Sequence, residues 1–252
     1  MKTRRSENLE QDHLPESIAQ RLKVPAKPQT VSDAVLGAID GCVTTFAVVS
    51  GAFGAGFSPA VALVLGFANL FADGFSMAVS NYEATRTQRE FIETIRQQEA
   101  EHIEKIPHGE KEEIRQIFQQ KGFEGEVLES IVNTISQDKK LWIDTMLTEE
   151  HGLQKIEPNS LRSALSTFTA FLLVGSMPLV PYMISTLTMA QQFMFSTVIA
   201  GIMFFAIGMI KSHYLAQPKL QSGFKTLLMG GAAASLAYLT GYLLQEVFHI
   251  GV

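Results

Sequence analysis

Apolar residues are concentrated in five long stretches of the chain, separated by polar segments of very different length. The stretches cover residues 34–56, 60–82, 163–186, 189–210 and 224–248. Each matches the length of about 20 residues that an α-helix needs to cross a bilayer core about 30 Å thick. The pattern therefore predicts an all-α, polytopic membrane protein with five transmembrane helices. Short uncharged loops after the first and third stretches predict helical hairpins.

The polar segment 83–157 predicts a cytoplasmic helical insert between spans two and three. The second span continues without a helix breaker to Pro107, which predicts a long stalk. Amphipathic patterns then predict helices over 109–121, 124–136 and 138–152. Their apolar positions are expected to form a small core from Ile114, Ile117, Phe118, Val127, Leu128, Ile131 and Ile135.

The chain accordingly divides into four parts. They are a cytosolic N-terminal tail over 1–32 with a short helix expected at 14–23, pore-forming spans one and two over 33–82, the insert over 83–157, and spans three to five over 158–252. Small residues at helical spacing within the spans, such as Gly37 and Gly41, predict tight helix packing or a dimer interface.

Charge predicts the orientation of the chain in the membrane. Lys and Arg collect in the tail, the insert and segment 211–225, so these parts are expected to face the cytosol and the end beyond Glu246 and His249 the opposite side. The tail lacks the apolar core of a secretory signal, which favours a prokaryotic plasma membrane. The net charge of −5 argues against nucleic acid binding, and the single cysteine, Cys42, excludes an internal disulfide.

Two polar stripes lie within the first two spans, where ionisable groups are expensive and are expected to have a function. One consists of Asp33, Gly37, Asp40 and Thr44, and the other of Asn69, Asp73, Met77 and Asn81. Facing stripes would line a path with carboxylate oxygen and thioether sulfur, which suits iron, manganese or zinc better than Mg²⁺ or Ca²⁺. The alternative is that Asp33 is a helix N-terminal charge and that Met77 is part of the packed core.

The insert carries pairs of metal-ligating side chains at helical spacing. The pairs are Glu99 with His102, Glu110 with Glu113, and Met146 with Glu150. Such pairs build metal sites in helical bundles, although Glu-rich solvated helices also contain them by chance. His108 and His151 are interpreted as surface residues.

The chain resembles the vacuolar iron transporter family from about Asp33 to its end. The specific parts are the runs DAVLGAIDGCVTTFAVVSGAFGAG, GFANLFADGFSMAVSNYEATRTQ and WIDTMLTEEHGL. The resemblance implies five spans, a homodimer whose pore is formed mainly by the first two spans, proton-coupled export of Fe²⁺ from the cytosol, and a cytoplasmic metal-binding insert.

The resemblance also implies roles for particular residues. Asp40 and Met77 match the pore positions, and Glu99, Glu110, Glu113, Met146 and Glu150 match the ligands of the insert. His102 stands where the family has a glutamate and is still able to ligate metal. Asn69 stands where some members have a glutamate, and Asp73, one turn further, is expected to replace that charge.

The resulting hypothesis is a proton-coupled secondary transporter that exports divalent iron, manganese or both, with no organic cofactor and no enzymatic activity. A membrane-tethered di-iron oxidase built on the insert, or a metal sensor anchored by the spans, are the alternatives. Phosphate-binding loops are absent from the sequence, so ATP-driven transport is not expected.

Overall fold

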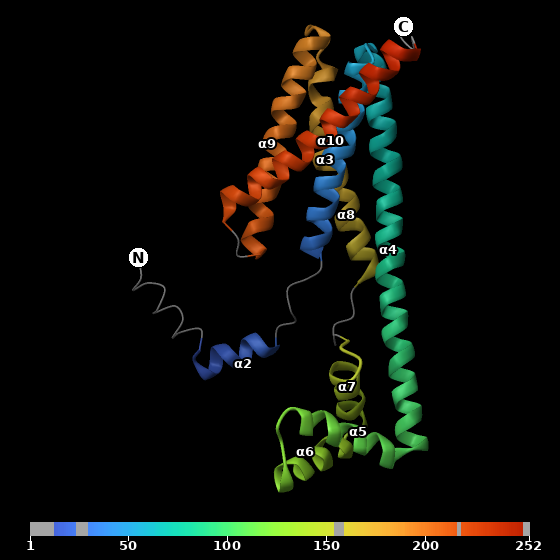
Figure 1. Ribbon diagram of the computed structural model, residues 1–252, viewed down its shortest axis with the longest axis vertical. Helices are drawn as coiled ribbons and strands as arrows, with labels where there is room; N and C mark the ends of the chain where they lie inside the picture. The colour runs from blue at the N-terminus through green and yellow to red at the C-terminus, as the bar shows by residue number, and fades with distance from the viewer. Residues whose placement is uncertain (1–12, 24–29, 154–158, 216–217, 249–252) are drawn as a thin grey trace.

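The computed structural model describes residues 13–23, 30–153, 159–215 and 218–248. Within these ranges the regular elements are helices: α2 (Pro15–Lys23), α3 (Thr30–Gly54), α4 (Pro59–Lys105), α5 (Pro107–Gln120), α6 (Gly125–Gln137), α7 (Lys139–Glu149), α8 (Ser160–Gly175), the 3-10 helix η1 (Met177–Met183), α9 (Met189–Leu215) and α10 (Lys219–Phe248). Figure 1 shows a helix bundle at one end, a small helical body at the other, and α4 running through both.

Five segments of the bundle are long and apolar enough to cross a membrane, which confirms the predicted spans. They are Thr30–Gly54, the first part of Pro59–Lys105, Ser160–Met183, Met189–Ser212 and Lys219–Phe248. The third span is not one α-helix, because α8 ends at Gly175 and the chain continues as η1. Pro178 and Pro181 lack the backbone N–H groups that a continuing α-helix needs.

Helix α3 lies in the middle of the bundle and packs against α8, α10, α4 and α9. Glycines make this packing possible, because a Cβ at Gly37 would lie 2.2 Å from the backbone oxygen of Thr167 on α8. A Cβ at Gly241 on α10 would likewise lie 2.2 Å from the backbone oxygen of Gly51. The small residues at these positions therefore serve packing within the chain.

The small helical body is formed by α5, α6, α7 and the distal half of α4. Its buried core consists of Ile103, Ile114, Leu128, Val132, Ile135, Trp142, Ile143, Met146 and Leu147. Ile117, Phe118 and Ile131 pack against this core as predicted, whereas the prediction for Val127 is wrong because its side chain is 59% exposed. Leu128, the next residue, occupies the inward face of α6.

The ends of the helices are grouped at the two ends of the bundle (Figure 1). The beginnings of α3, α8 and α10 and the end of α9 lie at the end from which α4 extends towards the small helical body. The α3–α4 loop and the connection from η1 to α9 lie at the opposite end. Helix α2 agrees with the short helix predicted at 14–23. The rest of the predicted tail over 1–12 and 24–29, the domain boundary at 157–158, and His249 lie outside the described residues.

Candidate metal site

Two carboxylates of the polar stripes come together inside the bundle. Asp40 on α3 and Asp73 on α4 are both half-buried and are close enough to interact electrostatically. Asn69 lies one turn before Asp73, and its buried side-chain nitrogen has no hydrogen-bond partner among the described residues. Met77 packs against the apolar core of the bundle. The meeting of α3 and α4 thus brings a pair of acids and an unpaired amide into one region.

The remaining members of the α3 stripe have other partners. Asp33 is buried against α8, where the Ser163 hydroxyl donates a 2.5 Å hydrogen bond to its Oδ2. The Thr44 hydroxyl donates to the backbone oxygen of Asp40 at 2.9 Å, within its own helix. The structure therefore brings Asp40 and Asp73 together and places Asp33 apart from them, because α8 occupies the side of α3 that carries Gly37.

In the insert, α4 and α5 bring together three ligating side chains. Glu99 and Glu110 are buried, with 3% and 4% of their surface exposed, and the exposed His102 lies one turn after Glu99 on α4. Nδ1 of His102 lies 3.4 Å from Oε1 of Glu110. One ligand atom from each of the three residues lies within 4.8 Å of those of the other two.

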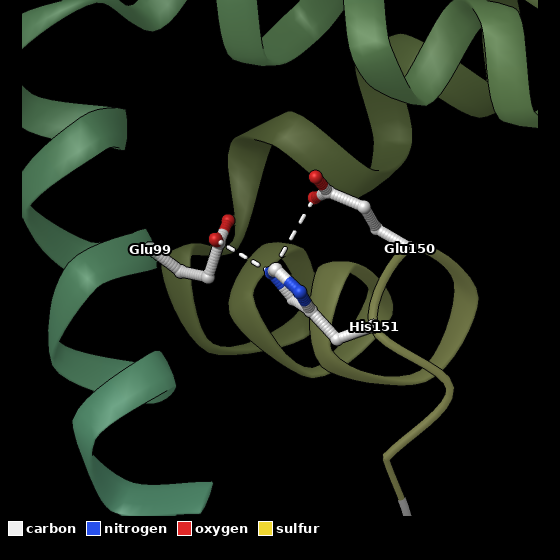
Figure 2. Close-up of side chains that lie close together, drawn as sticks. All are labelled: Glu99, Glu150 and His151. Carbon is white, nitrogen blue, oxygen red and sulfur yellow. Dashed lines mark hydrogen bonds and ion pairs between the residues drawn. The ribbon is translucent and has the colours of Figure 1, made fainter. Parts of the chain in front are cut away.

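A second group shares Glu99 and includes His151, which the sequence predicts to be a surface residue. Nε2 of His151 lies 3.0 Å from Oε1 of Glu99 and 3.6 Å from Oε2 of Glu150. Figure 2 shows the imidazole reaching from the end of α7 towards both carboxylates, with Glu99 projecting from α4. His151 is solvent-exposed as predicted, but it also belongs to the cluster.

Helical spacing alone did not reveal His151, because α7 ends irregularly. The helix ends at Glu149, and the backbone N–H of His151 bonds to the oxygen of Met146, five residues earlier. Gly152 then adopts a left-handed conformation with φ of +64°. The backbone N–H of Leu153 donates a hydrogen bond to the backbone oxygen of Leu147. The side chain of His151 therefore does not point in the direction that it would have if α7 continued as a regular helix.

The last two predicted ligands of the insert, Met146 and Glu113, have different surroundings. Met146 is fully buried in the core of the insert on α7. Glu113 is exposed on α5 and is close enough to raise the pKa values of Glu110 and Glu150. His108 is exposed on the same helix, in agreement with its interpretation as a surface residue.

The carboxylates of the cluster are electrostatically coupled to one another. Burial, followed by the nearby carboxylates of Glu113 and Glu99, raises the pKa of Glu110 to about 7, and His102 acts in the opposite direction. Burial also raises the pKa of Glu150, again assisted by Glu113 and Glu99 and opposed by the neighbouring imidazoles. A nearby cation would relieve this repulsion.

Basic side chains neutralise the acids around the cluster and leave the central acids without a cationic partner. The peripheral pairs are Lys105 with Glu101, Lys139 with Glu104, Lys121 with Glu149, Arg115 with Glu112 and Glu129, and Arg96 with Asp144. Within the described ranges, Glu99, Glu110 and Glu150 form ion pairs only with histidines. Buried carboxylates without a full set of partners are costly, so this arrangement favours a bound cation.

The sequence comparisons extend these observations to known proteins. The model of the VIT family matches residues 31–242 of the 252-residue chain. The chain belongs to the VIT family. The match covers the whole insert with its carboxylate cluster, the three middle spans, and all but the outer ends of the first and last spans.

Individual relatives of this VIT family protein match it over most of their length. It is 32% identical over 226 residues to a vacuolar iron transporter of Toxoplasma gondii, which covers 86% of this chain and 75% of the relative. It is 30% identical over 219 residues to vacuolar iron transporter 1 of Arabidopsis thaliana, covering 86% and 87% of the two chains. Vacuolar iron transporter 1 of Tulipa gesneriana is 29% identical over 244 residues, or 96% and 95%. The resemblance inferred from the sequence motifs is confirmed.

The donor atoms of the insert fit a divalent transition metal. Carboxylate oxygens bind hard cations, and the imidazoles of His102 and His151 add nitrogen donors that iron, zinc and cobalt accept more readily than Mg²⁺ or Ca²⁺. Oε2 of Glu99 and Oε2 of Glu110 are buried and have no hydrogen-bond partner among the described residues. In this VIT family protein they are free to serve as ligands.

Proposed function

We propose that this VIT family protein is a secondary transporter that exports divalent iron, manganese or both from the cytosol in exchange for protons. The observation that carries the proposal is the pairing of Asp40 and Asp73 across two membrane-spanning helices. Two neighbouring acids in a low-dielectric region favour a divalent cation or a proton between them, so each ion excludes the other. The names of the relatives, which are iron transporters, support iron as the transported ion.

The insert gathers the metal before transport in this proposal. Glu99 and His102 of the cluster lie on the distal part of α4, and the same helix carries Asn69, Asp73 and Met77 in its membrane-spanning part. The His102 imidazole is exposed and the His151 imidazole is partly exposed, so ions are able to enter and leave the cluster from solution. Metal then passes from the insert to Asp40 and Met77, and protons return along the same path.

The proposed orientation places the tail, the insert and the α9–α10 connection in the cytosol, in accordance with the distribution of Lys and Arg. The grouping of the corresponding helix ends on one end of the bundle supports this arrangement. A homodimer would cover the half-buried stripe of α4. The relatives named above are called vacuolar, so they give no support to a prokaryotic plasma membrane, and an organellar membrane is the alternative location.

The alternatives of an oxidase or a sensor are not favoured. The relatives are named transporters, and helices α5, α6 and α7 have only 14, 13 and 11 residues, which is short for the four-helix bundle of a di-iron oxidase. A sensor that uses the spans only as an anchor has no reason to bury Asp40 and Asp73 in them. We infer that the protein is not an enzyme and needs no organic cofactor.

The decisive experiment is metal flux into proteoliposomes under an imposed proton gradient, with Fe²⁺, Mn²⁺, Zn²⁺ and Ca²⁺ compared. We expect gradient-dependent uptake of iron or manganese by the wild-type protein and none by Asp40→Asn. The matched control is Ser76→Ala, which changes an exposed polar residue on α4 close to the stripe and is expected to transport normally. Normal flux through Asp40→Asn would contradict the proposed mechanism.

A further inference from the structure

The Glu99 carboxylate occupies an unusual position between two histidines. Its Oε1 is 3.0 Å from Nε2 of His151 at the end of α7, and it also belongs to the group with His102 and Glu110. Its Oε2 is buried and has no hydrogen-bond partner among the described residues. Among the described residues Glu99 therefore has one hydrogen-bond partner, His151, and no Lys or Arg forms an ion pair with it.

The contact with His151 satisfies only part of this arrangement. Nε2 of His151 lies within hydrogen-bond distance of Oε1 of Glu99, 3.0 Å away. Oε2 of Glu99 and Oε2 of Glu110 are buried and have no hydrogen-bond partner among the described residues, and the neighbouring carboxylates repel one another. A divalent cation bound by several of these oxygens would satisfy them together.

The position of His151 is fixed by its surroundings, as the position of a ligand must be. The closed turn at Gly152 sets the backbone at the end of α7, and Leu153 packs against the core of the insert. The ion pair between Arg96 on α4 and Asp144 on α7, 3.1 Å long, holds the same two helices together near the cluster. The imidazole is therefore directed towards Glu99 and Glu150 before any metal binds (Figure 2).

We propose that His151 is a metal ligand and determines which ions the insert prefers. With Glu99 and Glu150 it provides one nitrogen and two carboxylates for a divalent transition metal, beside the position formed by Glu99, His102 and Glu110. Neither the motif comparison nor the spacing of residues in α7 assigns His151 to the site. The nitrogen donor shifts the preference from Mn²⁺ towards Co²⁺ and Zn²⁺, which bind imidazole more strongly. The inference rests on the proposed function of the insert as the metal-collecting site.

Spectroscopy on the full-length protein in detergent tests the proposal directly. The variants are His151→Gln, His102→Gln, the double variant, and His108→Gln as a matched control on an exposed histidine outside both groups. Binding of Co²⁺ is followed by its visible ligand-field bands, and the nitrogen coupling of bound Mn²⁺ or Cu²⁺ is followed by pulsed electron paramagnetic resonance. Unfolding of each metal-free variant, followed by the fluorescence of Trp142, confirms that it is folded.

We expect His151→Gln to weaken Co²⁺ binding at least about tenfold, to change its ligand-field spectrum, and to weaken Mn²⁺ binding less. In the His102→Gln background the remaining imidazole coupling should disappear when His151 is also replaced. His108→Gln should behave as the wild type. Unchanged Co²⁺ affinity and spectrum in His151→Gln, or imidazole coupling that persists in the double variant, would overturn the assignment.

The experiments distinguish a wrong ligand assignment from a wrong transport mechanism. If His151→Gln loses the imidazole coupling but the wild-type protein shows no flux in proteoliposomes, His151 is a ligand and the proposed transport is wrong. If flux depends on Asp40 but the Co²⁺ spectrum of His151→Gln is unaltered, the protein is a transporter and His151 is not a ligand.

Discussion

The Asn81 side-chain amide donates a 2.7 Å hydrogen bond to the Thr167 hydroxyl and so joins α4 to α8. The Thr167 hydroxyl donates in turn to the backbone oxygen of Asp33 on α3, 3.3 Å away. One fully buried threonine therefore connects three membrane-spanning helices. In the absence of competing water, such bonds between helices contribute measurably to stability.

Removal of either side of this bond should destabilise the bundle. We predict that Asn81→Ala and Thr167→Val each lower the free energy of unfolding by about 0.6 to 1.7 kcal/mol. The double variant should lose less than the sum, because both changes remove the same interaction. Thermal unfolding in detergent, monitored by loss of the monodisperse peak in gel filtration, measures all three. Strictly additive effects would mean that the two residues do not interact.

The pKa of Glu110 predicts that the insert binds metal less well in acid. Metal requires the carboxylate form, and a proton competes for it as the pH falls through about 7. Mn²⁺ affinity should therefore fall between pH 8 and pH 6, and it should be weaker and less dependent on pH in this window in Glu110→Gln. Calorimetric titration of the purified protein measures both affinities. An affinity that is independent of pH in the wild type would contradict the prediction.

The same group gives the metal-free protein a stability that changes with pH. The folded pKa of Glu110 lies above its ordinary value of 4.5, so the folded state binds the proton more tightly. Its contribution is present in full below pH 4.5 and is lost as the pH rises through about 7. Trp142, the single tryptophan, is a core residue of the insert, so its fluorescence reports unfolding. The free energy of unfolding should decrease more with rising pH in the wild type than in Glu110→Gln.

Two glycines of α10 provide a matched test of the close packing of α3 and α10. A Cβ at Gly241 would lie 2.2 Å from the backbone oxygen of Gly51, whereas a Cβ at Gly231 meets nothing within 4 Å. We predict that Gly241→Ala destabilises the bundle by about 1 to 3 kcal/mol. Gly231→Ala should leave the thermal unfolding temperature unchanged or slightly raised, because alanine favours the helix. Equal effects of the two substitutions would show that the helices are not in contact at Gly51.

Adjacent residues of α6 test the observed orientation of that helix. Leu128 is 6% exposed and belongs to the core of the insert, whereas Val127 is 59% exposed. Leu128→Ala should destabilise the insert by about 2 to 5 kcal/mol, and Val127→Ala should change its stability by less than about 0.5 kcal/mol. Denaturant titration followed by Trp142 fluorescence compares them. A larger effect at Val127 would mean that α6 is rotated relative to the structure.

Much of the architecture follows from the sequence because its causes are local. Long apolar runs specify the five spans, the absence of a breaker specifies the continuous α4, and Pro107 marks its end. Helical spacing also predicts the residues that α4 and α5 contribute to the cluster, because both helices are regular there. These features depend on the order of residues within one helix.

The features that the sequence does not predict depend on contacts between distant segments or on irregular backbone. The stripe on α3 places Asp33 and Asp40 on one face, but α8 is inserted against the part that carries Asp33, and Ser163 lies 130 residues away. His151 follows an irregular helix end that no periodicity describes. Val127 and Leu128 are both apolar, and only the packing of α6 against its neighbours decides which of them is buried.

The length and continuity of helix α4 affect how movements are transmitted along it. Its 47 residues form a rod about 70 Å long, and no glycine or proline follows Gly74 before its end at Lys105. The segment after Gly74 has no glycine or proline, so a tilt of the end that carries Glu99 is transmitted along a stiff helix as far as Gly74, which lies between Glu99 and Asp73. We therefore expect a movement of the carboxylate cluster to reach the acid pair through the helix backbone at Gly74.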